Sequence, residues 1–97
     1  MYRLTPKAEC AKSLEAALRT LAANVVACPG SNGVQIYREQ RQPEGALVFM
    51  EAWRTAADWE ASKEHMPSGA FGALMAHVDG KPDLVELSRI VVFDPKD

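Results

Sequence analysis

Glu51 is the residue in this sequence whose type and position most clearly suggest chemistry. It lies between Phe49 and Trp53 on one face of residues 46–54, because successive side chains of a strand point to opposite faces. A carboxylate that is removed from water has a raised pKa, and it can act as a general base or accept a hydrogen bond from a phenol. The alternative stays open that Glu51 pairs with an arginine or a backbone donor and orients the helices that follow.

Aromatic side chains accompany this carboxylate. Phe49 and Trp53 share its face, and a flat tryptophan could form one wall of a pocket for an aromatic molecule. In the alternative interpretation, Trp53 is a core residue that packs against a helix. The two interpretations are compatible, and we treat both aromatic residues as candidate substrate contacts.

His65 is the second candidate for a base. An imidazole has an unperturbed pKa of about 6.5, which suits proton transfer from a quinol hydroxyl at neutral pH. The alternative is a surface or capping histidine at a helix end. Tyr37, on the polar side of residues 34–39, and Arg89 could contact a substrate oxygen. Each of these two could equally be an ordinary surface side chain.

The elements that must position these residues follow from periodicity and capping. Thr5-Pro6 predicts the start of the first helix. Thr55-Ala-Ala-Asp58 is typical of a capped helix start, Pro67 interrupts that helix, and Ser68 would cap a further short helix. The expected elements are a strand at 1–5, a helix at 7–26, strands at 34–39 and 46–54 joined by a turn at 42–45, helices within 55–78, and a strand at 84–93.

This order of elements predicts a ferredoxin-like split βαβ fold of the α+β class, with a four-stranded antiparallel sheet that carries its helices on one face. Residues 46–54 and 84–93 are nevertheless mostly apolar on both faces. An antiparallel sheet with one wet face does not need such a pattern. The second apolar face therefore predicts a homodimer, in which another copy of the sheet covers it.

Length and composition exclude several classes of function. The 97 residues, 47% hydrophobic and 25% charged, predict one domain over residues 1–97. The formal net charge is −2 and the basic residues are scattered, so neither nucleic acid nor a membrane surface is an expected partner. Without a signal peptide or a spanning apolar run, we expect a cytoplasmic protein. Cys10 and Cys28 should be free thiols, because the first helix separates them.

Several separated motifs resemble one known family. Pro29-Gly30, an alternating strand, Glu51-x-Trp53 and His65-x-x-Ser68-x-x-Phe71 resemble the antibiotic biosynthesis monooxygenase (ABM) domain family of the dimeric α+β barrel superfamily. The resemblance runs over about residues 3–93. It implies two ferredoxin-like subunits that close into a barrel, with a pocket between sheet and helices in each subunit. It also implies site roles for His65 and Phe71, which match positions of the family motif.

The resemblance leaves several activities to choose from. Members of the family include cofactor-free oxygenases of phenolic or quinol polyketides, quinol monooxygenases and haem-degrading enzymes. In haem-degrading relatives an axial histidine follows the motif phenylalanine by four residues, and here that position is Met75. Their first-strand asparagine is also missing from residues 1–5. Haem degradation is therefore disfavoured, and because no metal cluster or nucleotide-binding glycine motif is visible, we expect no cofactor.

These observations favour a cofactor-independent monooxygenase that acts on a phenolic or quinol-type aromatic small molecule. The main alternative is a non-enzymatic dimeric module that binds a small hydrophobic ligand, or a barrel with a purely structural role. A third option is removal of reactive aldehydes or quinones by another reaction. An enzyme should have a cavity that Glu51, Trp53 and His65 reach together, whereas a structural dimer should pack these side chains against their neighbours.

Overall fold

The computed structural model describes residues 1–40, 45–91 and 93–95. Most of the turn predicted at 42–45 lies outside the described residues. The elements in chain order are β1 (Tyr2–Leu4), α1 (Ala11–Val26), β2 (Ser31–Arg38), β3 (Leu47–Trp53), α2 (Ala56–Ser62), the 3-10 helix η1 (Lys63–His65), α3 (Ala70–Met75) and β4 (Asp83–Leu84).

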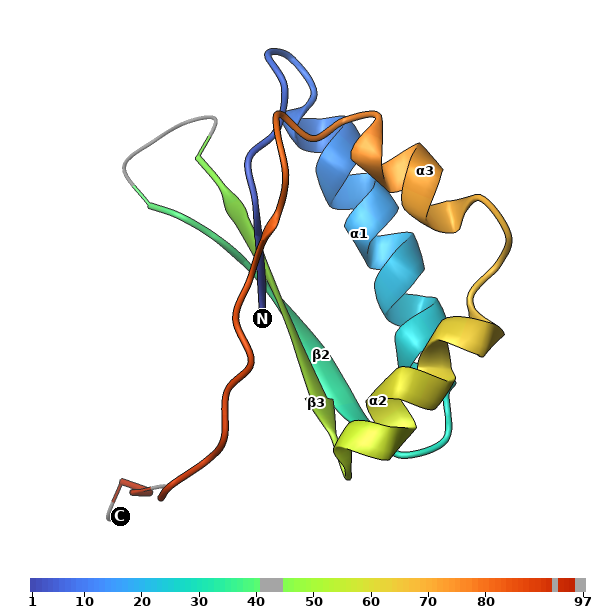
Figure 1. Cartoon of the computed structure of the whole chain (residues 1–97). Coiled ribbons are helices and arrows are strands. Elements are labelled where there is room, and N and C mark those ends of the chain that lie inside the picture. The colour runs from blue at the N-terminus through green and yellow to red at the C-terminus, as the bar shows by residue number, and fades with distance from the viewer. Residues whose placement is uncertain (41–44, 92, 96–97) are drawn as a thin grey trace.

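The strands form one four-stranded antiparallel sheet in the order β2-β3-β1-β4, and the helices lie on one side of it (Figure 1). Tyr2 pairs with Phe49 and Val34 pairs with Glu51, so these four side chains share the face toward the helices. The predicted α+β ferredoxin-like fold is thus confirmed. None of the described helices is long and apolar enough to cross a membrane.

The core lies between α1 and the sheet. Leu14, Leu18 and Val25 recur on one side of α1 and are almost fully buried against Leu47 and Phe49 of β3. Truncating a buried phenylalanine to alanine typically costs about 3–5 kcal/mol of unfolding free energy, so Phe49 is one of the main anchors of β3. This packing fixes the strand that carries Glu51.

The first helix begins later than predicted, at Ala11 and not directly after Pro6. Pro6 forms an antiparallel bridge with Val78, and the backbone N–H of Asp79 donates to the carbonyl of Thr5 at 2.7 Å. Pairing with this distant segment holds residues 5 and 6 in an extended conformation, which overrides the local helix-start signal. Cys10 and Cys28 flank the helix as free thiols.

The second helical region begins as predicted and continues differently. The hydroxyl of Thr55 accepts a hydrogen bond from the backbone N–H of Asp58 at 3.1 Å and so caps α2. A single 3-10 turn, η1, follows α2 and ends before Pro67. The next helix, α3, has Gly69 at its N-cap and not Ser68, because the backbone there is left-handed, with φ of 80°.

The predicted strand at 84–93 is wrong in length, since only Asp83 and Leu84 form β4. The ammonium and carbonyl groups of Met1 still exchange hydrogen bonds with the backbone of Val85, each at 2.8 Å. Beyond Val85 the chain runs away from the sheet (Figure 1), so the described residues that follow form no ladder with β1. Apolar side chains in this segment are exposed, among them Ile90 at 95% and Phe93 at 90%.

Candidate functional site

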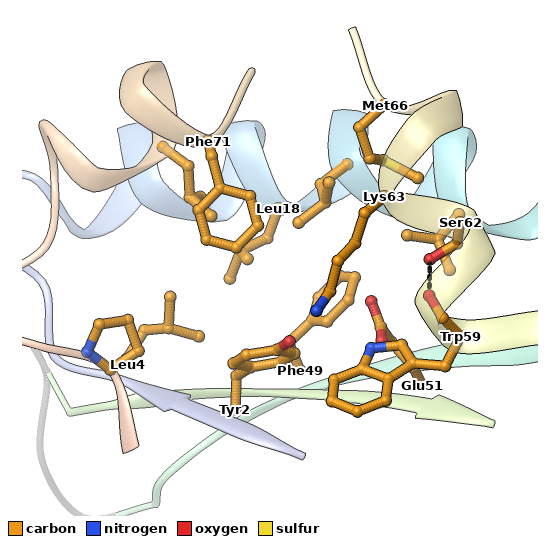
Figure 2. Close-up of a pocket in the computed structure, with 14 residues that line it drawn as sticks. Tyr2, Leu4, Leu18, Phe49, Glu51, Trp59, Ser62, Lys63, Met66 and Phe71 are labelled. Atoms are coloured by element: carbon orange, nitrogen blue, oxygen red, sulfur yellow. Dashed lines mark hydrogen bonds between the residues drawn. The ribbon is translucent and has the colours of Figure 1, made fainter. Parts of the chain in front are cut away.

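A cavity of about 300 Å³ lies between the sheet and the helices (Figure 2). Strands β1 and β3 form one wall, α1 forms a second, and the segment from α2 to α3 forms a third. Its apolar lining consists of Leu4, Leu18, Leu21, Val25, Phe49, Met66, Phe71, Leu74 and Pro82. The volume and the lining suit a small, largely apolar molecule.

The carboxylate of Glu51 is the acidic group on this lining. Glu51 is half-buried, and its side chain points from β3 into the cavity (Figure 2). Its Oε2 atom accepts a hydrogen bond of 3.1 Å from Nε1 of Trp53. Because this hydrogen bond occupies only one of the carboxylate oxygens, the group retains the capacity to accept a proton or a hydrogen bond from a ligand.

Tyr2 stands beside this carboxylate on the neighbouring strand (Figure 2). The pKa of the Tyr2 hydroxyl is raised above its ordinary value, mainly because burial disfavours the phenolate and also because Glu51 carries negative charge nearby. A side-chain hydrogen bond with Trp59 acts in the opposite direction. At neutral pH, Tyr2 is therefore a neutral hydroxyl that can donate to a ligand oxygen.

Lys63 and Trp59 supply a cationic and aromatic corner of the cavity. The ammonium of Lys63 lies 4.9 Å from the centre of the Trp59 ring, a cation–π distance. Its Nζ atom is also 3.2 Å from Oε2 of Glu60, in an ion pair that is exposed on both sides. Figure 2 shows the lysine side chain extending from η1 toward the space above Tyr2 and Phe49.

The cavity gathers some of the residues predicted from the sequence. Glu51, Phe49 and Phe71 line it. Trp53 is half-buried and is held against Glu51 by its indole N–H, but its side chain is not part of the lining. The predicted carboxylate and its tryptophan are therefore brought together, with only the carboxylate facing the cavity.

Three predicted site residues lie elsewhere. His65 is exposed on η1 and is not part of the lining. Tyr37 lies on the opposite face of the sheet, where its hydroxyl donates to Oε1 of Gln35 at 2.7 Å. Arg89 lies in the exposed segment after β4. The structure does not bring Glu51, Trp53 and His65 together in one cavity.

Tyr2, Trp59 and Lys63 were not singled out as site residues by the sequence analysis. A signal for Tyr2 was present, because alternation along residues 1–5 places Tyr2 and Leu4 on one face. Trp59 and Lys63 are four residues apart, the spacing that puts two side chains on the same side of a helix. The pairing of β1 with β3 brings Tyr2 to the same site as Trp59 and Lys63, and these local signals do not reveal that pairing.

Across the ranges 1–40, 45–91 and 93–95, no group of three or more histidine, cysteine or acidic side chains could hold a metal ion. The polar groups available to a ligand are thus the side chains of Tyr2, Glu51, Trp59, Ser62 and Lys63. Ser62 is buried, and its hydroxyl donates to the carbonyl of Trp59 at 2.5 Å. These groups can remove a proton, donate to an oxygen and balance a negative charge.

An antiparallel sheet with helices on one face and a mostly apolar cavity between them defines a ferredoxin-like α+β protein with a ligand-sized site. The model of the family described as "Antibiotic biosynthesis monooxygenase" matches residues 1–77. The chain therefore belongs to this family, and every residue of the lining except Pro82 falls within the matched part. No protein of curated function matches the chain.

Solved structures share the fold at low sequence identity. A putative antibiotic biosynthesis monooxygenase from Nitrosomonas europaea is 17% identical, with a TM-score of 0.76 over 94% of this chain and 100% of that one. A conserved protein from Methanosarcina mazei Go1 is 18% identical, with a TM-score of 0.74 over 84% and 81% of the two chains. Rv0793 from Mycobacterium tuberculosis is 16% identical, with a TM-score of 0.71 over 93% and 94%.

Proposed function

We propose that this protein is a cofactor-independent monooxygenase of a phenolic or quinol-type aromatic small molecule. The observation that carries the proposal is the Glu51 carboxylate, which points into an otherwise mostly apolar cavity and has an oxygen available to a ligand. Membership of the antibiotic biosynthesis monooxygenase family supports the class of reaction.

In the proposed reaction, Glu51 takes the proton from a substrate hydroxyl. The resulting anion is electron-rich and can transfer electrons to O₂ directly. With a quinol, one oxygen atom adds to the ring, the other leaves as water, and the product is a hydroxyquinone. All four electrons come from the quinol, so the balance needs no external reductant and no bound cofactor.

The cavity would contribute position and environment. Phe71 offers a flat surface to an aromatic ring, and the apolar wall excludes water from the anion. The neutral hydroxyl of Tyr2 is placed to donate to the oxygen on which charge develops. In this proposal Tyr2 takes the donor role for which the sequence suggested Tyr37 or Arg89, because those two lie outside the cavity.

His65 has no role in this proposal, since its exposed position on η1 leaves it outside the lining. The competing function is a module that binds a hydrophobic ligand without reaction. Oxygen uptake with hydroquinones and naphthols separates the two, and transfer of oxygen-18 from O₂ to the product identifies a monooxygenase. Ligand binding without uptake above the buffer rate would favour the binding module.

We also propose that the protein acts as a homodimer. The sheet face that points away from the helices carries Val48, Met50 and Ala52 of β3. A sheet face in contact with solvent is ordinarily polar, and this one is apolar. The segment after β4 exposes further apolar side chains at Leu87, Ile90, Val91 and Phe93. A second copy of the chain would cover both surfaces at once.

A further inference from the structure

The charge distribution around the cavity is uneven. Among the described residues that line the cavity, Lys63 is the only one with a cationic side chain, and Glu51 is the only acidic one. Lys63 reaches the cavity from η1, whereas Glu51 reaches it from β3. A ligand that enters this space therefore meets an ammonium and a carboxylate that come from different elements on a largely apolar wall.

The ammonium of Lys63 is available to a ligand. Its partner Glu60 does not line the cavity, and the side chains of Lys63 and Glu60 are 60% and 62% exposed. Ion pairs between such exposed side chains contribute little, because water screens them and both side chains lose freedom. An anion bound in the cavity would be less screened and would compete well for the ammonium.

Trp59 orients the Lys63 ammonium. The Trp59 ring lines the cavity and lies under the Lys63 ammonium at 4.9 Å. The cation–π contact favours a lysine rotamer that keeps the charge at the cavity and not in bulk solvent. An aromatic ligand that packs beside Trp59 would thus bring a ring substituent close to Nζ.

We infer that the site selects an aromatic molecule that carries an anionic oxygen, either a carboxylate or a phenolate, which pairs with the Lys63 ammonium while the ring packs against Phe71 and Trp59. Repulsion from Glu51 disfavours any orientation in which the charged substituent contacts this carboxylate and not Lys63. A neutral hydroxyl elsewhere on the ring then faces Glu51 and Tyr2. This inference rests on the proposed function only in taking the cavity as the substrate site.

Binding of simple probes tests this inference without any turnover. Isothermal titration calorimetry would compare 2-naphthoate, its neutral isostere 2-naphthamide, and 2-naphthol with the full chain. We expect 2-naphthoate to bind about tenfold more tightly than 2-naphthamide, the size of effect that one charge-assisted contact produces. The ultraviolet absorption of bound 2-naphthol reports whether it binds as the naphtholate, which distinguishes the two sources of the anionic oxygen.

Variants assign the effect to one ammonium. Lys63→Gln should abolish the preference for naphthoate over naphthamide and any binding of naphtholate, while Lys63→Arg should restore most of it. Lys12→Gln removes an exposed charge from α1 and should leave the preference unchanged. Circular dichroism and thermal unfolding of each variant confirm that it is folded.

The inference is overturned if the wild-type chain binds naphthamide as tightly as naphthoate and binds 2-naphthol only in its neutral form. It is also overturned if the charge preference survives in folded Lys63→Gln. Oxygen uptake is measured separately, so a charge preference without uptake would retain the anion site and reject the oxygenase. Oxygen uptake without a charge preference would retain the oxygenase and reject the anion site.

Discussion

Nε1 of Trp53 donates a hydrogen bond of 3.1 Å to Oε2 of Glu51, two residues away on the same strand. The contact follows from the alternation of β3, which puts both side chains on the face toward the helices. It restricts the carboxylate to one orientation and leaves its other oxygen toward the cavity. Trp53 therefore acts on a ligand only through Glu51, as a positioning residue.

Trp53→Phe tests this relationship. The substitution keeps an aromatic ring and removes the N–H donor, so Glu51 should lose orientation while the fold remains. We expect kcat/KM for quinol oxidation to fall about tenfold, mostly in kcat, because one hydrogen bond to a charged group is lost. Oxygen-electrode kinetics check this, and an unchanged kcat in the folded variant would assign Trp53 to packing alone.

Gly30 gives a prediction for stability. Its φ is +82°, and an added Cβ would collide with the carboxylate of Asp58, which hydrogen bonds from Arg54 and Thr55 hold in place. Gly30→Ala should therefore lower the free energy of unfolding by about 1–3 kcal/mol, measured by urea denaturation.

Gly72 is the matched control, because it lies within α3 and an added Cβ there meets nothing within 4 Å. Gly72→Ala should raise the free energy of unfolding by about 0.5–1 kcal/mol, since alanine is the better helix former. Equal effects of the two substitutions would mean that Asp58 does not confine Gly30.

Asp58 also predicts how stability depends on pH. Its pKa is lowered from 3.8, first by the hydrogen bond from Arg54 and then by that from Thr55. A lowered pKa in the folded state contributes stability that is present above the unfolded value and lost as the pH falls through the folded one. Thermal midpoints measured down through this acidic range should fall less steeply for Asp58→Asn than for the wild type.

Arg54→Met removes the first cause of that shift and should flatten the same profile in part. The acid branch is the informative one, because Asp58 is fully ionised in both folded and unfolded chains at neutral pH. If the wild type and Asp58→Asn lost stability in parallel on acidification, the ion pair of Arg54 and Asp58 would contribute nothing to the acid response.

The proposed dimer is open to a direct test of mass. We expect light scattering coupled to gel filtration to give about twice the chain mass of 10.6 kDa at micromolar concentration. Met50→Glu places a charge on the sheet face away from the helices and should shift the protein toward monomer, whereas Ala23→Glu on the exposed side of α1 should not. A wild-type monomer at that concentration would contradict the proposal.

The sequence predicted the parts of the fold that short-range patterns determine. Alternation in β3 put Phe49 and Glu51 on the correct face, and Thr55 was identified as a helix cap. The start of α1 was wrong because Pro6 pairs with Val78, a partner remote in the chain that no local signal reveals. The length of the last strand was wrong because strand length depends on pairing with β1, which only Asp83 and Leu84 make among the described residues and which local alternation does not reveal.

The site was predictable to a similar degree. Glu51 was found because a carboxylate interrupts an apolar face, and a single strand suffices to show that. Lys63 and Met66 follow Trp59 at intervals of four and three residues, the spacing of one helix side, and all three line the cavity. His65 was favoured because it matches a position of the family motif, but it lies on the exposed side of η1, whereas Lys63 was missed although its spacing from Trp59 was a signal.

Oxygen uptake by Glu51→Gln tests whether the Glu51 carboxylate removes the substrate proton. Glutamine keeps the size of the side chain and an acceptor for the Trp53 N–H, but it cannot accept the proton. We predict uptake with a hydroquinone or naphthol in the wild type, a loss of at least about 100-fold in Glu51→Gln, and no loss in the exposed control Glu64→Gln. Wild-type rates in folded Glu51→Gln would contradict the account.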